Sequence, residues 1–300
     1  MRVAITGANS GIGLRAVRRF AESGADVIAL SRSRERGELA IATLARDARA
    51  RVRLVELDLA SPVSIAGAAE TVVAEGPLDV LINNAAVFDL SAREARFTET
   101  GQELFWATNH LGPTEFTARV SGALAAAPSP RVVFVASKGL VTMPGLAIRF
   151  DALTDGSWFT PTKAYYHSKL AQVMTAVTLA ERVGDLVDVS CLRVPAVRLD
   201  ADRLAEQPPI LRALYAPKNR LAMPAEALAD VYVDLGAGAP RHPRGSDVYV
   251  DEKRRVVALP RSARDAAQRE RLWSVTAEAT GNPAWAWEAA GRPTGRSRVD

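Results

Sequence analysis

The stretch Thr6-Gly7-Ala8-Asn9-Ser10-Gly11-Ile12-Gly13 lies between an apolar run and an amphipathic one. The run before it predicts a short buried strand, and the one after it predicts a helix. Glycines at a strand-to-helix turn let the backbone approach a phosphate, and the helix start offers free N–H groups. The stretch therefore predicts a loop that holds the phosphates of a dinucleotide, with a tight structural turn as the alternative. The candidate contacts are Gly7, Asn9, Ser10, Gly11, Ile12 and Gly13.

The alternation of strand and helix continues along the chain. The apolar runs are continuous, as strands of a sheet covered on both faces require. The repeated strand–helix pattern predicts an α/β fold: a single Rossmann-type, doubly wound domain with a parallel sheet flanked by helices. The predicted strands are Arg2–Thr6, Asp26–Leu30, Val52–Leu57, Leu78–Asn83, Arg131–Ala136, Val187–Leu192 and Asp247–Val250. The predicted helices include Ile12–Ser23, Ser61–Glu75, Thr100–Ala126, Thr162–Val183 and Ser262–Thr280.

Residues 1–260 are expected to form the dinucleotide-binding domain, and residues 261–300 a C-terminal helix and tail. The tail, with Trp285 and Trp287, is expected to be extended or mobile. Two irregular stretches, 138–161 and 195–224, follow strand ends. Ligands of open α/β sheets bind at that edge, so we expect the two stretches to line a substrate site. The alternative is that they are surface excursions with small apolar clusters of their own.

Composition limits the possible chemistry. The 300 residues are 48% hydrophobic and 24% charged, which is typical of a globular protein. Cys191 is the only cysteine, so an intrachain disulfide is impossible. The three histidines, at positions 110, 167 and 242, are far apart. We therefore expect no metal site of the zinc-finger or four-cysteine type, and no metal in the mechanism.

The charge pattern also limits the expected partners. The net charge is +4, from 38 basic and 34 acidic residues, and the two signs are interspersed. A nucleic-acid-binding protein would more often gather its basic residues on one element, so no nucleic acid is expected. No run reaches the ~18 apolar residues of a membrane span. The N-terminus lacks the pattern of a signal peptide, so a cytoplasmic protein is expected.

The end of the second predicted strand indicates which dinucleotide is bound. An acidic residue there would bind a ribose 2′-hydroxyl, whereas an arginine accommodates a 2′-phosphate. This chain has Ser31 followed by Arg32, and no acid. A guanidinium matches a phosphate in a bidentate pair, so NADP(H) is favoured over NAD(H). The alternative is that Arg32 is simply solvated.

Four residues form a candidate catalytic group. Tyr165 and Lys169 are four positions apart on a predicted helix, and hence on one face. A nearby ammonium lowers the pKa of a phenol, which would make Tyr165 a usable acid or base. Ser137 follows a predicted strand at its carboxyl end, and Asn109 lies in a predicted helix. Each has a structural interpretation alone, but together with the glycine loop they point to catalysis.

These segments, in this order, resemble the short-chain dehydrogenase/reductase family over residues 1 to about 200. The sequences Thr108-Asn109-His110-Leu111-Gly112, Ile148–Trp158 and Arg271-Leu272-Trp273 resemble its retinol-dehydrogenase-like and protochlorophyllide-reductase-like branch. The resemblance implies a seven-stranded sheet of order 3-2-1-4-5-6-7 and a homodimer or homotetramer. The further cofactor contacts it implies are Asp58, Leu59, Asn84, Ala85, Pro195 and Val197, besides Tyr165 and Lys169.

The resemblance also implies roles in hydride transfer between a nicotinamide and a carbonyl or alcohol. Tyr165 would donate the proton, and Lys169 would lower its pKa and hold the nicotinamide ribose. Ser137 would hydrogen-bond the substrate oxygen, and Asn109 would hold a water in the proton relay. Apolar residues in the two irregular stretches suggest a hydrophobic small-molecule substrate.

Three positions depart from the family pattern. Asn-Asn-Ala-Gly is Asn83-Asn84-Ala85-Ala86 here, and the Pro-Gly after the sixth strand is Pro195-Ala196. The threonine expected next is replaced within Val197-Arg198-Leu199-Asp200. An NADP(H)-dependent oxidoreductase is the leading hypothesis. The alternative is a redox-silent protein of the same fold, either a cofactor-binding module or a cyclase or dehydratase that uses Tyr165 as acid or base.

Overall fold

The computed structural model describes residues 1–184, 186–198, 222–239, 241, 243 and 245–289. Within them, seven strands form one parallel sheet in the order β3-β2-β1-β4-β5-β6-β7. The predicted fold and strand order are confirmed. The order reverses between β1 and β4, so a crevice of the kind that binds ligands lies beside the end of β1. The strands are β1 (Arg2–Thr6), β2 (Asp26–Ser31), β3 (Val52–Glu56), β4 (Val80–Asn83), β5 (Arg131–Ser137), β6 (Asp188–Val194) and β7 (Tyr249–Val250).

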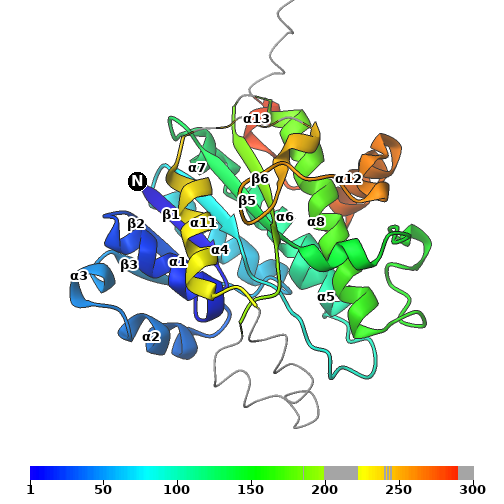
Figure 1. Cartoon of the computed structure of the whole chain (residues 1–300), viewed down its shortest axis with the longest axis horizontal. Coiled ribbons are helices and arrows are strands. Elements are labelled where there is room, and N and C mark those ends of the chain that lie inside the picture. Colours follow the sequence, from blue (N-terminus) through cyan, green and yellow to red (C-terminus); the bar gives the residue numbers. More distant parts are fainter. Residues whose placement is uncertain (185, 199–221, 240, 242, 244, 290–300) are drawn as a thin grey trace, which may run out of the picture.

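Helices cover both faces of the sheet (Figure 1). Helices α1 and α11 lie side by side over one face, whereas α4, α6 and α8 pack on the other. The helices are α1 (Gly11–Glu22), α2 (Arg34–Ala42), α3 (Arg46–Arg49), α4 (Pro62–Ala74), α5 (Leu104–Trp106), α6 (Gly112–Arg119), α7 (Ser121–Ala125), α8 (Pro161–Val183), α11 (Ala225–Ala237), α12 (Ala266–Ala279) and α13 (Ala286–Ala289). Shorter helical turns are η1 (Ala107–Leu111), η2 (Lys138–Thr142), η3 (Phe150–Ala152), η4 (Gly245–Val248) and η5 (Arg261–Arg264).

The central strands are apolar throughout because both of their faces are buried. In β1, Ala4 packs into one apolar cluster, while Val3 and Ile5 pack into the other. Successive side chains of a strand point to opposite sides, so each face needs its own helical cover. The sheet thus divides the core into two layers and leaves the carboxyl ends of its strands to carry the polar residues.

Side-chain caps set the start of two long helices. The Ser61 hydroxyl accepts a hydrogen bond from the Ser64 N–H (3.3 Å), and Pro62 is the first residue of α4. The Thr160 hydroxyl does the same for Lys163 (3.3 Å) at the start of α8. The start predicted for the first of these helices, at Ser61, is confirmed, with Ser61 as the cap and proline as the first helical residue.

The predicted helix Thr100–Ala126 is wrong in detail. The Glu103 carboxylate accepts the N–H groups of Phe105 and Trp106, each at 3.0 Å, so the helix begins only at α5. The chain then passes through the π-helical turn η1 and breaks at Val120 between α6 and α7. The last predicted strand is also shorter, because residues before Tyr249 form a 3₁₀ turn.

The expectation of an extended or mobile tail is wrong for Trp285 and Trp287. Both are buried, and the Trp285 ring stacks on that of Trp273 at 5.2 Å. The Ala286 N–H donates to the Ser121 hydroxyl (2.9 Å), which fixes α13 against α7. Among the described residues, no helix has both the length and the apolarity needed to cross a membrane.

Candidate functional site

The glycine loop has the conformation that its sequence predicts. Gly7 and Gly11 have φ angles of 66° and 55°, in the left-handed region that favours glycine. A Cβ at Gly13 would lie 2.2 Å from the Gly7 carbonyl oxygen, so only glycine fits where α1 meets the loop. The glycines therefore allow the tight loop and the close packing of α1 that a pyrophosphate-binding turn requires.

The start of α1 is suited to a negatively charged group. Its N-cap, Ser10, makes no side-chain capping hydrogen bond, and the first turn contains no acidic residue. Orphan N–H groups and the positive end of the helix dipole are therefore free of an internal counter-charge. Asn9, Ser10 and Ile12 lie in this loop, where the sequence predicted cofactor contacts.

Asn84 fixes the loop to the rest of the sheet edge. Its amide nitrogen donates to the carbonyl oxygens of Thr6 (2.9 Å) and Gly7 (3.3 Å). Its amide oxygen accepts from the Tyr232 hydroxyl (2.9 Å) of α11. The Ala85 N–H donates to the Thr6 hydroxyl (2.9 Å). Asn84 and Ala85 thus hold the first glycine in place from the end of β4.

Arg32, Asp58 and Leu59 were predicted to contact the cofactor, Arg32 at the ribose that carries the 2′-phosphate. They follow β2 and β3, which are neighbours in the sheet. Arg32 is exposed, and Arg34 rather than Arg32 pairs with Glu56 (3.7 Å). The Asp58 carboxylate accepts the Ala60 N–H (2.9 Å), and Leu59 is buried. Arg32 is therefore presented to solvent at the sheet edge, while Asp58 and Leu59 shape the loop beside it.

Ser137 and Tyr165 meet at the carboxyl end of β5. Ser137 is the last residue of that strand, and Tyr165 lies in the second turn of α8. The Ser137 hydroxyl lies near enough to the Tyr165 phenol to act to lower its pKa. Burial has the larger effect and raises the pKa of Tyr165 to about 12. The phenol thus keeps its proton at neutral pH, and the lowered pKa expected from the sequence is not seen.

Lys169 is placed near Tyr165 but bonds elsewhere. Its ammonium nitrogen lies 5.9 Å from the centre of the Tyr165 ring. It donates to the carbonyl oxygen of Val135 (2.7 Å) and to the side-chain oxygen of Gln172 (2.8 Å). Burial lowers the pKa of Lys169 to about 7, with a smaller opposing effect from the Cys191 thiol. The lysine is therefore close to the point where its charge is lost at neutral pH.

Asn109 lies in the π-helical turn η1 and is fully buried. Its amide nitrogen donates to the Val87 carbonyl oxygen and to the Ser168 hydroxyl, both at 3.0 Å. Its amide oxygen accepts the Val87 N–H (2.7 Å). Both N–H bonds are thus used inside the protein, so a relay water would have to bind the remaining lone pair or the backbone. π-Helical turns are frequent at functional sites.

Pro195 and Val197 follow β6, at the same edge of the sheet. Val197 forms a β-bridge with Met223, whose N–H donates to the Ala196 carbonyl oxygen (2.9 Å). This pairing fixes the chain just after β6. The departure from the family pattern at Leu199 and Asp200, and most of the stretch 195–224, lie outside the described residues.

The stretch 138–161 does not present its large aromatic residues to the site. The Trp158 ring packs at 5.0 Å from that of His167, and the Phe159 ring at 5.9 Å from Phe105. The His167 ring nitrogen accepts the Arg149 N–H (3.0 Å), which ties the stretch to α8. For these two aromatic residues, the structure supports the alternative of a small apolar cluster.

Three residues of the site were missed by sequence reasoning. The Phe88 ring lies 4.5 Å from that of Tyr165 and is half exposed, Tyr232 bonds Asn84, and Gln172 bonds Lys169. Phe88 follows the end of β4, where ligands gather, so its position was a usable signal. Gln172 lies three residues after Lys169 on the same helix, a spacing that brings side chains together. Tyr232 gave no local signal.

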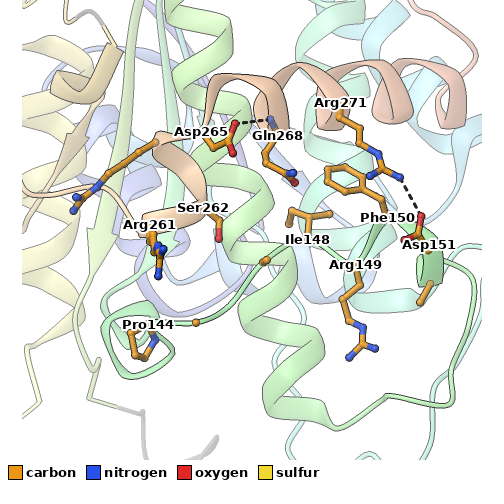
Figure 2. Close-up of a pocket in the computed structure, with 14 residues that line it drawn as sticks. Pro144, Ile148, Arg149, Phe150, Asp151, Arg261, Ser262, Asp265, Gln268 and Arg271 are labelled. Carbon is orange, nitrogen blue, oxygen red and sulfur yellow. Dashed lines mark hydrogen bonds and ion pairs between the residues drawn. The ribbon is translucent and has the colours of Figure 1, made fainter.

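A surface cavity of about 1010 Å³ lies away from these residues, between segments 144–152 and 261–271 (Figure 2). Figure 2 shows Arg149, Arg261 and Arg271 pointing in different directions rather than at one point. Arg271 pairs with Asp151 (3.0 Å) and lies over the Phe150 ring. Part of the stretch 138–161, which the sequence predicted to line a substrate site, lines this cavity, whereas none of the predicted catalytic or cofactor-binding residues does, and no function is assigned to it.

A parallel sheet with a glycine loop at its switch point, and with Ser137, Tyr165 and Lys169 at the same edge, defines a class. It is that of the Rossmann-type oxidoreductases that bind a nicotinamide dinucleotide. The family model for short chain dehydrogenases matches residues 1–148.

Curated relatives narrow the class. Human (Homo sapiens) retinol dehydrogenase 14 is 31% identical over 91% of this chain and 84% of its own length. Retinol dehydrogenase 12 of Bos taurus is 33% identical over 93% of this chain and 86% of its own length. The chloroplastic protochlorophyllide reductase of Chlamydomonas reinhardtii is 31% identical over 71% of this chain and 59% of its own.

Solved structures agree in fold. An uncharacterized protein from Mycobacterium paratuberculosis superimposes with a TM-score of 0.68 and 26% identity, covering 95% of this chain and 94% of the other. A short chain dehydrogenase from Shigella flexneri, complexed with NADP, gives 0.63 and 19% identity over 84% of this chain and 96% of its own. The chain belongs to the short-chain dehydrogenase/reductase family, in its retinol-dehydrogenase-like branch.

Proposed function

We propose that this chain is an NADP(H)-dependent oxidoreductase that interconverts a carbonyl and an alcohol of a hydrophobic small molecule. The observation that carries the proposal is the position of Ser137, at the end of β5, and Tyr165, on α8, close together at the sheet edge where the glycine loop lies. Tyr232 of α11 hydrogen-bonds Asn84 under the loop, and its pKa is raised by burial and, to a smaller extent, by Tyr165. The proposed proton donor and the proposed dinucleotide loop thus belong to the same edge of the sheet.

The chain's own residues would supply the proton chemistry, and the bound nicotinamide would supply or accept the hydride. In reduction, the Tyr165 hydroxyl donates its proton to the substrate oxygen as the carbonyl carbon gains the hydride. Ser137 hydrogen-bonds the same oxygen and holds it against the phenol. A phenol that keeps its proton at neutral pH is in the correct state to act as this donor. Lys169, beneath the tyrosine, would hold the nicotinamide ribose.

The choice of NADP(H) is supported by Arg32. It follows β2, where the ribose is bound in such folds, and its side chain is exposed. The residue before it, Ser31, is buried and not acidic, so no carboxylate at that position repels a 2′-phosphate. A guanidinium can meet that phosphate with two parallel hydrogen bonds.

The hydrophobic substrate is supported by Phe88 and by the relatives. A large apolar ring that is 51% exposed and packed against Tyr165 offers an apolar surface to a ligand. Two of the three curated relatives above are named for retinol, an alcohol with a long apolar chain. A cytoplasmic location and a homodimer or homotetramer are parts of the same proposal, which cell fractionation and light scattering would test.

The test is NADPH oxidation with a panel of apolar aldehydes and ketones, comparing wild type with Tyr165→Phe and Tyr166→Phe. We expect turnover by wild type, retention of activity by the Tyr166 variant, and a loss of about 100-fold or more for Tyr165→Phe. Binding of NADPH, followed by its fluorescence, should survive in both variants. Undiminished turnover by Tyr165→Phe would show that another group donates the proton. NADPH binding without turnover of any carbonyl would favour the redox-silent alternative.

A further inference from the structure

Gln172 lies one helical turn after Lys169 on α8, and both side chains are buried. The Gln172 side-chain oxygen accepts a hydrogen bond from the Lys169 ammonium at 2.8 Å. We propose that Gln172 is a positioning residue that holds the Lys169 ammonium in its charged form beside Tyr165. The inference rests on the proposed function, since it gives Gln172 a part in the same proton chemistry.

The surroundings of Gln172 favour this role over simple packing. Gln172 is itself buried, in a part of α8 that is buried throughout from His167 to Ala180, so packing alone does not require a polar side chain there. Its amide nitrogen is buried without a hydrogen-bond partner among the described residues. A buried unsatisfied N–H costs free energy, and the bond of Gln172 to Lys169 is what offsets that cost.

The Lys169 ammonium is supported from two sides. The Val135 carbonyl oxygen of β5 is its other acceptor, at 2.7 Å. An ammonium has three N–H donors, so these two bonds leave one for a ligand or a water at the sheet edge. With both acceptors in place, the nitrogen is fixed 5.9 Å from the centre of the Tyr165 ring.

Few charged groups face this lysine. The Cys191 thiol of β6 is buried, and its own pKa is raised to about 12, so it stays neutral. Tyr165, on the same helix, also keeps its proton at neutral pH. Tyr249 of β7 is the residue paired with Cys191 in the sheet, and its pKa is raised by burial. Burial lowers the pKa of Lys169 to about 7, against a smaller opposing effect of Cys191. Removal of one of its two neutral acceptors should therefore change the pH at which the ammonium loses its proton.

Two substitutions of similar size should shift the pKa of Lys169 in opposite directions. Gln172→Met removes the acceptor, so the proton should leave Lys169 at a pH lower by about one unit. Gln172→Glu places a carboxylate at the same position, so the proton should leave at a pH higher by at least that much. A defect of packing would not produce shifts of opposite sign.

The experiment measures the lysine directly. The chain has five lysines, so protein labelled with ¹³C at the lysine Cε gives five NMR signals, and Lys169→Met identifies the one of interest. Its titration is followed in wild type, Gln172→Met and Gln172→Glu, with circular dichroism to confirm folding. Opposite shifts support the proposal. If the pKa of Lys169 in the folded variants stays within about 0.3 unit of wild type, the proposal is overturned. Such a change is well below the pKa shift that loss of one hydrogen bond would cause.

A second readout separates this proposal from the proposed function. The pH profile of kcat for NADPH-dependent carbonyl reduction should lose activity on the alkaline side at lower pH in Gln172→Met and at higher pH in Gln172→Glu. If the titrations shift but wild type reduces no carbonyl, the proposed function fails while Gln172 is still shown to hold the charge. If wild type is active and its profile does not move with the titrations, the catalytic part of the inference is overturned.

Discussion

Burial changes the pKa values of the two titratable groups of the candidate site in opposite directions. It raises the pKa of Tyr165 to about 12 and lowers that of Lys169 to about 7. In both cases the form that carries no charge is favoured, since a charged group loses its hydration. At neutral pH the phenol is protonated, while the lysine is poised between its two states. This combination suits a tyrosine that donates a proton during carbonyl reduction.

Cofactor preference should depend on Arg32. Replacing it with aspartate removes a charge-assisted hydrogen bond to the 2′-phosphate and adds repulsion, so NADPH should bind about 10- to 100-fold more weakly. NADH should bind as well as before or better. Dissociation constants from titration of each cofactor's fluorescence would measure the change.

Arg36→Asp is the matched control for that change. Arg36 is also exposed but lies within the first turn of α2 rather than directly after β2, so the net charge changes equally. It should leave the NADPH/NADH ratio within about twofold of wild type. An equal loss of preference in both variants would mean that Arg32 acts only through overall charge.

Some residue-level features could be predicted and others could not. Ser137 and Tyr165 were identified because a strand end and a helical Tyr-x-x-x-Lys spacing are visible in sequence. The raised phenol pKa and the bond from Lys169 to Gln172 were not, because they depend on burial and on side-chain conformation. The Tyr232–Asn84 bond joins residues 148 positions apart, and no local pattern indicates such a pair.

At the level of elements, the junction between β1 and α1 is packed too closely to accept a larger side chain at Gly13. Gly13 packs against the Gly7 carbonyl oxygen and the Asn84 amide at once. Gly13→Ala should therefore push the loop outward, lower the free energy of unfolding by about 1–3 kcal/mol and weaken NADPH binding. Thermal unfolding and cofactor titration would measure the two effects.

Gly67→Ala serves as its control, because Gly67 lies in α4 with open space around its Cβ position. Alanine is the better helix former there, so stability should stay equal or rise by up to about 1 kcal/mol. Equal stability and cofactor affinity in the Gly13 and Gly67 variants would contradict the close packing of the glycine loop.

The strands and most long helices followed from apolar runs and amphipathic periodicity, since these patterns reflect burial on the two faces of the sheet. The π-helical turn around Asn109 could not be predicted from these patterns. It places Asn109 against Val87 and Ser168, 22 and 59 residues away, and sequence periodicity does not register such contacts. The helix break at Val120 was likewise not predicted.

On the scale of the whole molecule, the C-terminal residues up to 289 complete the core. Trp285 and Trp287 belong to the same apolar cluster as α4, α6 and α8. Trp285→Ala should lower the free energy of unfolding by about 3–5 kcal/mol, because it leaves a cavity beside Trp273. Urea unfolding, followed by circular dichroism, would measure the loss.

Leu39→Ala provides the comparison, since Leu39 is 64% exposed on α2. It should change stability by no more than about 0.5 kcal/mol. A Trp285 variant as stable as the Leu39 variant would show that the C-terminal segment does not pack as described.

Hydride transfer itself can be followed with NADPH that carries deuterium at both C4 positions, incubated with the protein and an apolar aldehyde. The alcohol formed should carry one deuterium on its carbinol carbon, as shown by mass spectrometry, and Tyr165→Phe should form little of it. Oxidation of the cofactor without deuterium in the alcohol, or no alcohol from any aldehyde or ketone despite bound NADPH, would contradict the proposed oxidoreductase activity.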